Sequence, residues 1–158
     1  MIELDALDLR LLDLLQTDAA RANQALAEAA HASPATTLRR VRRLIDSGVI
    51  ERQVAIVSPQ QVAGLTALVE VSLDAQGAEH LQAFEQRAVA EAPVQQCYRV
   101  SPGPDFMLVV WAPDMAAYHA LVQRLFTQDA NVRNVKAFFS VHRAKFEPRV
   151  VLPAAAGG

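Results

Sequence analysis

The segment Ser33–Gly48, SPATTLRRVRRLIDSG, contains the clearest helix signals in the sequence. Ser33 is a favoured N-cap residue, Pro34 suits the first position of a helix, and Gly48 stands where helices commonly end. Apolar residues at helical spacing predict one buried face, made by Leu38, Val41, Leu44 and Ile45. The opposite side carries a hydroxyl and arginines, namely Thr36, Arg39, Arg40 and Arg43, with Arg42 on the flank.

This pattern suits a helix that lies in the major groove of DNA. Arginine donates two hydrogen bonds to a guanine edge or to phosphate oxygens, and a helix N-terminus favours a phosphate. The alternative is a solvated basic face on an ordinary amphipathic helix. The candidate DNA contacts in and beside the segment are Ser33, Thr36, Thr37, Arg39, Arg40, Arg42, Arg43 and Arg52.

The distribution of charge supports the DNA-binding interpretation. The chain has 158 residues and a formal net charge of −2. Residues 1–30 carry two arginines and six acidic residues, whereas residues 34–52 carry five arginines and two acidic residues. Positive charge is therefore concentrated on one element, and the local field steers a ligand more than the total charge does.

Composition narrows the class of protein. With 52% hydrophobic and 20% charged residues, the chain can bury a core. The single cysteine, Cys97, excludes an internal disulfide and fits a reducing compartment. No apolar run approaches the roughly 20 residues of a membrane span, and the start lacks the basic residues of a signal peptide. We therefore expect a soluble cytoplasmic protein that does not enter a membrane.

The motifs of catalysis and of metal or cofactor binding are missing. The four histidines, at positions 31, 80, 119 and 142, form no i, i+4 pair. No glycine-rich phosphate loop follows a predicted strand, and no serine or cysteine stands in a nucleophile motif. The sequence predicts no catalytic residue, no metal site and no cofactor.

The residues before Ser33 predict a helix-turn-helix. Leucine periodicity gives one helix from about Asp5 to Thr17, and Asn23 can cap a second, Gln24–Ala30. A short turn at 31–33 joins it to the basic helix, which is the helix-turn-helix pattern. After Gly48, a β-rich stretch at 49–57 predicts two short strands that form a wing beside the basic helix or, equally, a hairpin that only covers the core.

The remainder predicts a separate βαββαβ domain. Residues 58–61 break the pattern, and strands, helices and strands then alternate over 65–73, 78–91, 94–100, 106–112, 114–128 and 132–145. The predicted fold class is α+β, an N-terminal winged helix-turn-helix domain followed by a ferredoxin-like domain. The boundaries are 1–52 for the first domain, 53–64 for a linker, 65–148 for the second domain and 149–158 for a tail.

The second domain predicts an oligomer. A four-stranded sheet with helices on one side leaves its other face open, and apolar side chains there favour a dimer that packs open face to open face. Two helix-turn-helix units related by a twofold axis would then bind an inverted-repeat site on double-stranded DNA.

Four blocks of this sequence resemble the Lrp/AsnC, or feast/famine, family of transcription regulators: LDALDLRLLDLLQTDAARAN, SPATTLRRVRRLIDSGVI, VSPQQVAG and PDMAAYHALV. The resemblance implies a DNA-binding regulator that forms homodimers, assembles further to an octamer, and answers to an amino-acid effector. It places the effector site near Tyr98, Ser101, Gly103, Asp105, Asn134, Val135 and Ala137. Because Val135 and Ala137 are apolar, we expect a branched or aromatic amino acid.

An enzyme remains the alternative. Haem-biosynthesis decarboxylases resemble the same two-domain architecture and carry a His-Tyr-x-Arg stretch in the second domain. Here Cys97-Tyr98-Arg99 has the tyrosine without the preceding histidine, and the arginine comes one position early. Four arginines on one helix also have no obvious purpose in such an enzyme.

Overall fold

The computed structural model describes residues 2–152, which divide into two compact units. A helical unit holds residues 2–56 together with 145–152, and a sheet unit holds Val57–Ala144. The boundary lies inside the predicted linker, 53–64. Within the described residues, no helix is long and apolar enough to cross a membrane.

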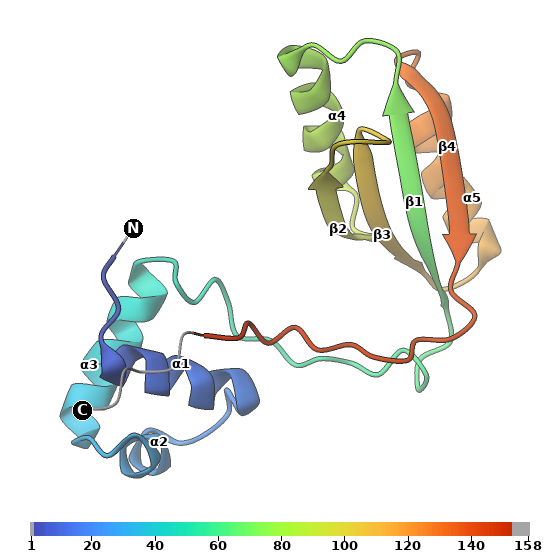
Figure 1. The fold of residues 1–158 in the computed structure, drawn as a ribbon. Coiled ribbons are helices and arrows are strands. Elements are labelled where there is room, and N and C mark those ends of the chain that lie inside the picture. Colours follow the sequence, from blue (N-terminus) through green and yellow to red (C-terminus); the bar gives the residue numbers. More distant parts are fainter. Residues whose placement is uncertain (1, 153–158) are drawn as a thin grey trace. The chain divides into compact units, whose positions relative to one another are not determined.

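The helical unit contains α1 (Ala6–Thr17), α2 (Asn23–Ala30) and α3 (Pro34–Asp46), drawn in blue to cyan in Figure 1. Asp5 caps α1, because its side chain accepts the N–H of Asp8 while Asp8 accepts the N–H of Asp5. A small apolar cluster joins the helices and consists of Leu11, Leu15, Leu26 and Ala30.

The segment after the sheet unit returns to α1, which differs from the predicted tail. Gln16 brackets the backbone of Val150: its Nε2 donates to the carbonyl at 3.1 Å, and its Oε1 accepts the N–H at 2.7 Å. Arg149 pairs with Asp13 on the same helix. The sequence did not predict this contact, because the backbone of Val150 is bound by the side chain of one glutamine and not by a neighbouring strand. Residues 153–158 of the predicted tail lie outside the described residues.

The predicted wing strands do not form. Between Asp46 and Leu65 the structure contains no strand. Gly48 ends α3 with a φ of +75°, and Ile50 donates its N–H to the carbonyl of Leu44 at 3.0 Å. The following residues are extended but find no ladder partner in the described chain, so β propensity alone does not make a hairpin.

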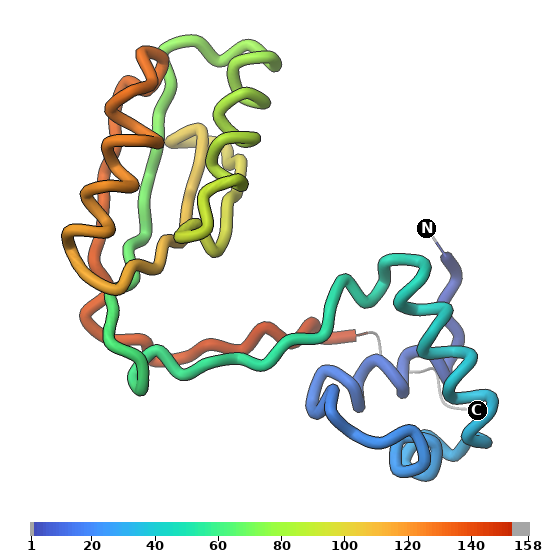
Figure 2. The backbone as a smooth tube through the Cα atoms, turned by 180° about the vertical axis from the view of Figure 1, so that it is seen from behind, coloured from blue at the N-terminus to red at the C-terminus, as the bar shows by residue number. Residues whose placement is uncertain are grey.

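The sheet unit has the predicted βαββαβ order. Its strands are β1 (Leu65–Leu73), β2 (Val94–Arg99), β3 (Phe106–Ala112) and β4 (Val132–Phe139). They form one antiparallel sheet in the order β2-β3-β1-β4. The helices α4 (Ala78–Ala90) and α5 (Met115–Val122) cover one face, as the front and back views show (Figures 1 and 2). This confirms the predicted fold class for the second domain.

The core of the sheet unit lies between the sheet and these two helices. Phe84 of α4 packs against Phe106, with ring centroids 4.8 Å apart, and Phe126 follows α5 in a π-helical turn, Gln123–Thr127. Alternate residues of β1 and β3 point into the core. Strand β4 ends at Phe139, earlier than the predicted Lys145, because its partner β1 begins at Leu65. Just beyond the strand, the N–H of Ser140 donates to the carbonyl of Thr66 at 2.8 Å.

Candidate nucleic-acid interface

The start of α3 is held by three polar contacts. Ser33 Oγ accepts the N–H of Thr36 at 3.2 Å, which confirms the predicted N-cap, and its hydroxyl donates to Thr36 Oγ1 at 2.9 Å. Asn23 Nδ2 donates to the carbonyl of Pro34 at 3.0 Å, so the start of α2 is fastened to the start of α3. His31 takes the left-handed conformation in the turn, with a φ of +56°, as expected for a short helix-helix turn.

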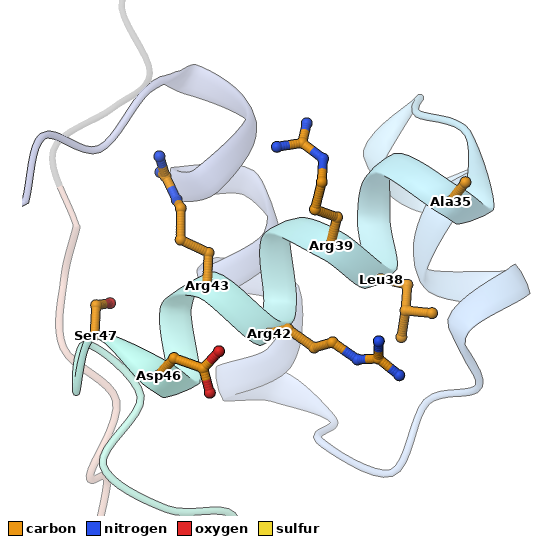
Figure 3. A pocket seen from close by; sticks show the side chains of 7 residues that line it. All are labelled: Ala35, Leu38, Arg39, Arg42, Arg43, Asp46 and Ser47. Atoms are coloured by element: carbon orange, nitrogen blue, oxygen red, sulfur yellow. The ribbon is translucent and has the colours of Figure 1, made fainter.

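The outer face of α3 is a shallow open pocket formed by that helix and its C-terminal turn (Figure 3). Arg39 and Arg42 are exposed there, and within residues 2–152 neither makes an ion pair. The side chains of the pocket are those of Ala35, Leu38, Arg39, Arg42, Arg43, Asp46 and Ser47. A surface with unpaired guanidinium groups beside small and apolar side chains can contact both phosphates and base edges.

The inner face of α3 is rotated relative to the prediction. Leu44 and Thr37 are fully buried, and Val41 packs on the small apolar cluster. Leu38 and Ile45, predicted to be buried, are 42% and 44% exposed. The prediction that Thr37 contacts DNA is wrong, because Thr37 is 0% exposed and its hydroxyl cannot reach a ligand. The reason is that α1 and α2 contact α3 along the Thr37–Leu44 line, which the leucine pattern alone does not reveal.

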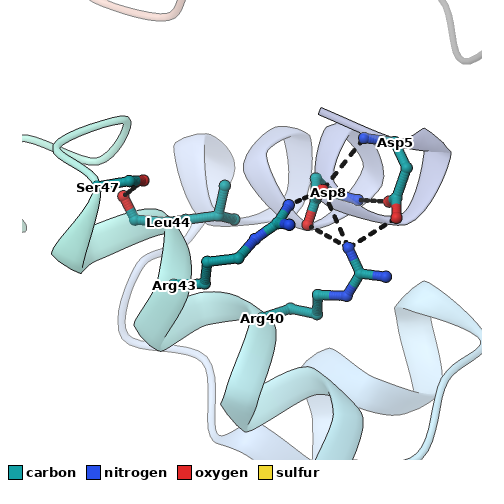
Figure 4. A network of polar contacts seen from close by, with 6 residues as sticks. All are labelled: Asp5, Asp8, Arg40, Arg43, Leu44 and Ser47. Carbon is teal, nitrogen blue, oxygen red and sulfur yellow. Dashed lines mark hydrogen bonds and ion pairs between the residues drawn. The ribbon is translucent and has the colours of Figure 1, made fainter. Parts of the chain in front are cut away.

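A buried carboxylate holds two of the arginines. Asp8 of α1 is fully buried, and Arg40 Nη1 lies 3.2 Å from both of its oxygens (Figure 4). The same Nη1 is 2.6 Å from Asp5 Oδ2, and Arg43 Nη2 contacts Asp8 Oδ2. Asp5 therefore closes the network from the first turn of α1, and the two arginines tie α3 to α1.

The Asp8 network corrects the predicted role of Arg40 and shifts that of Arg43. Arg40 was expected on the solvent side, but only 21% of its side chain is exposed and it points towards α1. Arg43 is 43% exposed, lines the outer pocket and still pairs with Asp8. A signal existed in the sequence: acids three residues apart, Asp5 and Asp8, match arginines three residues apart, but pairing between helices requires their packing.

Electrostatics in the network follow from these contacts. The pKa of Asp5 is lowered, first by the hydrogen bond from the backbone of Asp8 and then by the guanidinium of Arg40. The pKa of Arg40 is raised, chiefly by its hydrogen bond to Asp5. The free positive charge of α3 is therefore smaller than its arginine count suggests, and it is concentrated on Arg39 and Arg42.

The other predicted DNA contacts differ in position. Ser33 is exposed and Thr36 is half-buried at the N-terminal turn of α3, beside the outer pocket. Arg52 is exposed in the extended segment that follows Gly48, without the hairpin that was expected to present it.

The predicted effector residues form a looser group in the sheet unit. The loop from Ser101 to Asp105 joins β2 to β3 and contains the cis Ser101–Pro102 bond. Asp105 Oδ2 accepts the N–H of Leu73 at 2.7 Å and the amide of Gln76 at 3.3 Å. Asp105 thus fastens this loop to the end of β1. Within the described residues its Oδ1 accepts no hydrogen bond.

The sheet register brings part of this group together. Asn134 and Val135 of β4 lie opposite Ser72 and Val71, next to the point where Asp105 holds β1. Neighbouring residues of a strand face opposite sides of the sheet, and Val135 packs against the core, so only Asn134 points to the open face. Ala137 lies opposite Val69, further along the strand. Tyr98 is 54% exposed on the edge strand β2, where its hydroxyl donates to Gln96 Oε1 at 3.0 Å. Among the described residues, no cluster of three or more metal-ligating side chains occurs.

Comparison with known proteins gives the family. The model for winged helix-turn-helix DNA-binding domains matches residues 4–51, and the model for the Lrp/AsnC ligand binding domain matches residues 66–150. The chain belongs to the Lrp/AsnC family. An uncharacterized HTH-type transcriptional regulator of Haemophilus influenzae is 38% identical over 153 residues, which is 96% of this chain and 91% of that protein.

Solved structures agree with this assignment. An AsnC family transcriptional regulator from Agrobacterium tumefaciens has a TM-score of 0.83 at 29% identity, covering 94% of this chain and 97% of that one. A Neisseria meningitidis transcriptional regulator, solved as a complex with L-Met, has a TM-score of 0.81 at 25% identity, with the same two coverages. As a member of the Lrp/AsnC family, the chain is a DNA-binding transcriptional regulator, which decides against the decarboxylase alternative.

Proposed function

We propose that this Lrp/AsnC regulator binds an inverted-repeat operator as a dimer, with Arg39 and Arg42 of each α3 contacting DNA, and that an amino acid bound by the sheet unit modulates the binding. The observation that carries the DNA contact is the division of the arginines of α3. Arg40 and Arg43 anchor the helix to Asp8, whereas Arg39 and Arg42 are exposed and unpaired within the described residues. Because the helix itself is already held in place, the ordering cost of binding is confined to the exposed side chains.

The test of this contact is a double replacement. Arg39→Ala with Arg42→Ala removes both free guanidinium groups, and a contact of this kind costs about 1–3 kcal/mol per arginine. The slope of log affinity against log salt should also become shallower, because fewer counterions are released. Arg10→Ala is the matched control, since Arg10 is exposed on α1 and outside the proposed contact. Unchanged affinity and salt slope in the double variant would reject the assignment.

The proposed dimer uses the open face of the sheet. Leu68 lies on this face, opposite Val109 of β3 and Phe138 of β4. Leu68 and Phe138 are 43% and 51% exposed, and together with Val109 they form an apolar row on the side away from α4 and α5. Covering such a row with the same row of a second chain removes it from water and gives a closed twofold assembly. Further association to an octamer would place several operator-binding surfaces in one particle.

Sedimentation equilibrium tests the dimer. Leu68→Lys with Phe138→Lys places charges at the centre of the row without touching the core, and it should produce a monomer that keeps the far-ultraviolet circular dichroism of the wild-type chain. Lys136→Ala, on the same face beyond the apolar row, serves as the control and should remain oligomeric. If the double variant sediments like the wild-type chain, the dimer forms elsewhere.

The proposed effector site lies around Asp105 and Asn134, next to the end of β1. The free Oδ1 of Asp105 can accept an ammonium group, and backbone N–H groups near Gly103 can hold a carboxylate. The L-Met complex of the Neisseria regulator supports an amino acid as the ligand class. Val135 and Ala137 face the side of the sheet that the helices cover. Asn134 instead shares the open face with the exposed Leu68 and Phe138, which favours a ligand with an apolar side chain.

Calorimetry against the twenty amino acids tests the effector. A branched, aromatic or thioether side chain should give the largest heat, and binding should be accompanied by a change in oligomer size, since a ligand acts through different affinity for two states. Asp105→Asn keeps an oxygen for the N–H of Leu73 and should weaken ligand binding. Undiminished binding in that variant would move the site away from Asp105.

A further inference from the structure

Leu38 is an apolar side chain on the outer face of α3, where solvent or DNA must contact it. It is 42% exposed and lines the same pocket as Arg39 and Arg42 (Figure 3). Its neighbour one turn earlier is Ala35, which also lines the pocket, so the two make a small apolar spot among polar groups. The inner face of α3 is filled by Leu44 and Thr37, and Leu38 is therefore not needed for the core.

The major groove offers only one apolar group to such a side chain. Each base pair presents donors and acceptors there, and the C5-methyl of thymine is the sole exception. Leu38 lies in the N-terminal half of α3, the part of a recognition helix that contacts base edges. Arg42 lies four residues further along and Arg39 is adjacent, so guanidinium donors flank the apolar spot and fix its distance from the DNA backbone.

We propose that Leu38, with Ala35 beside it, recognises the C5-methyl group of one thymine in each half of the operator. This inference rests on the proposed function, because it requires that the outer face of α3 enters the major groove. It adds a determinant of specificity that differs from the arginines: Arg39 and Arg42 donate hydrogen bonds, whereas Leu38 selects a base by excluding water from a methyl group.

The experiment removes the methyl group from the DNA and the side chain from the protein. The operator is first obtained by selecting bound duplexes from random DNA with the full chain. Each thymine of a half-site is then replaced by deoxyuridine, which lacks only the C5-methyl. At one position the affinity should fall about fourfold, the factor expected for one methyl-sized group removed from contact.

The protein variants assign that effect. In Leu38→Ala the deoxyuridine duplex and the thymine duplex should bind equally at the sensitive position, while affinity for unrelated duplex DNA stays as in the wild type. Ile45→Ala is the matched control, because Ile45 is 44% exposed on the same helix, about two turns further towards the C-terminus. This control should keep the full fourfold difference.

A second variant covers the case in which Leu38→Ala folds poorly. Leu38→Gln keeps the size and the helix propensity of the side chain, and an amide pairs with adenine. Selection with this variant should replace thymine at the sensitive position, most often by adenine.

The outcomes separate this inference from the function on which it rests. If no specific duplex is selected, the proposed DNA-binding function fails. If an operator is selected but no thymine is sensitive to deoxyuridine, or if Leu38→Ala keeps the sensitivity, the role of Leu38 is rejected while the function stands. An effect lost equally in Ile45→Ala would assign it to helix stability and overturn the inference.

Discussion

The two units stabilise their helices in different ways. In the sheet unit, α4 and α5 are held by an apolar core in which Phe84, Phe106 and Phe126 pack together. In the helical unit the apolar cluster is small, and α3 is held in addition by the buried Asp8 and two arginines. The unit that must present a surface to DNA therefore orients its helix with directional contacts, whereas the unit that forms a sheet relies on packing.

This difference explains why the arginines of α3 are not equivalent. An apolar contact tolerates small rotations of a helix, but a carboxylate that accepts from Arg40 and Arg43 fixes the rotation of α3 about its axis. That rotation decides which residues face outward. Arg39 and Leu38 are therefore placed by contacts that are made on the other side of the helix.

The largest expected effect tests the apolar core that holds the helices of the sheet unit. Phe84→Ala leaves a cavity beside Phe106 and should lower the free energy of unfolding of the sheet unit by about 3–5 kcal/mol. The unfolding of this unit in denaturant is measured by the fluorescence of Trp111, which is the only tryptophan of the chain and lies in β3. Val89→Ala on the same helix, where Val89 is 63% exposed, should change stability by less than about 0.5 kcal/mol. Equal effects of the two replacements would contradict the described core.

The second prediction tests the contacts of Asp8 with Arg40 and Arg43 in the helical unit. Asp8→Ala leaves the guanidinium groups of Arg40 and Arg43 without their shared acceptor and should destabilise the helical unit by about 1–3 kcal/mol. The cost stays below that of Phe84→Ala because both arginines can turn towards water. Hydrogen exchange of the amides of α1 and α3 measures the effect in the full chain.

A graded variant distinguishes charge from shape at Asp8. Asp8→Asn keeps an acceptor for the N–H of Asp5 but loses the charge, so its effect should lie between wild type and Asp8→Ala. Operator affinity should fall in the same order, because α3 loses its fixed rotation. Asp8→Ala with normal exchange protection and normal affinity would mean that the apolar cluster alone orients the helix.

Local rules predicted much of this molecule. The bounds of α3 follow from Ser33, Pro34 and Gly48, whose preferences depend on backbone geometry within a single turn. The βαββαβ order follows from alternating periodicities, and the helix-turn-helix follows from a short turn that His31 closes in the left-handed conformation. In each case, neighbouring residues contain the information.

The errors arose where distant residues decide. Whether Thr37, Leu38 or Arg40 faces outward depends on the contact line with α1 and α2. The exposed segment at 49–57 has β propensity but forms no ladder within the described residues, and residues 145–152 return to α1 through Gln16 and Asp13. A single sequence does not contain these pairings in any local pattern.

The third prediction compares one capping contact in each unit. Ser33 caps α3, and Asp114 caps α5 by accepting the N–H of Ala117 at 2.7 Å. Replacement of either residue by alanine should cost about 1 kcal/mol in the unit that contains it. Only Ser33→Ala should also lower operator affinity, because it loosens the start of α3, the helix proposed to contact DNA. Equal loss of affinity in Asp114→Ala would show that the sheet unit transmits small changes in its stability to DNA binding.

The smallest expected effect concerns acid. The pKa of Asp5 lies below the ordinary value of 3.8, because the charged form accepts the backbone N–H of Asp8 and pairs with Arg40. A lowered pKa in the folded state gives stability that is fully present above the unfolded value and is lost as the pH falls through the folded one. The helical unit should therefore lose stability below about pH 4.

Asp5→Asn separates this titration from the cap. Asparagine caps a helix as well as aspartate does, so the variant keeps the hydrogen bond to Asp8 but carries no charge. Hydrogen exchange of the helical unit is measured at about pH 5 and about pH 3 and corrected for the intrinsic pH dependence of exchange. The protection of this unit should change less between the two pH values in the variant than in the wild type. The sheet unit serves as the internal control, because Glu91, whose pKa is lowered by Arg124, is unchanged in the variant. If the helical unit of Asp5→Asn loses protection in acid as steeply as the wild type, the titration of Asp5 does not govern the acid stability of this unit.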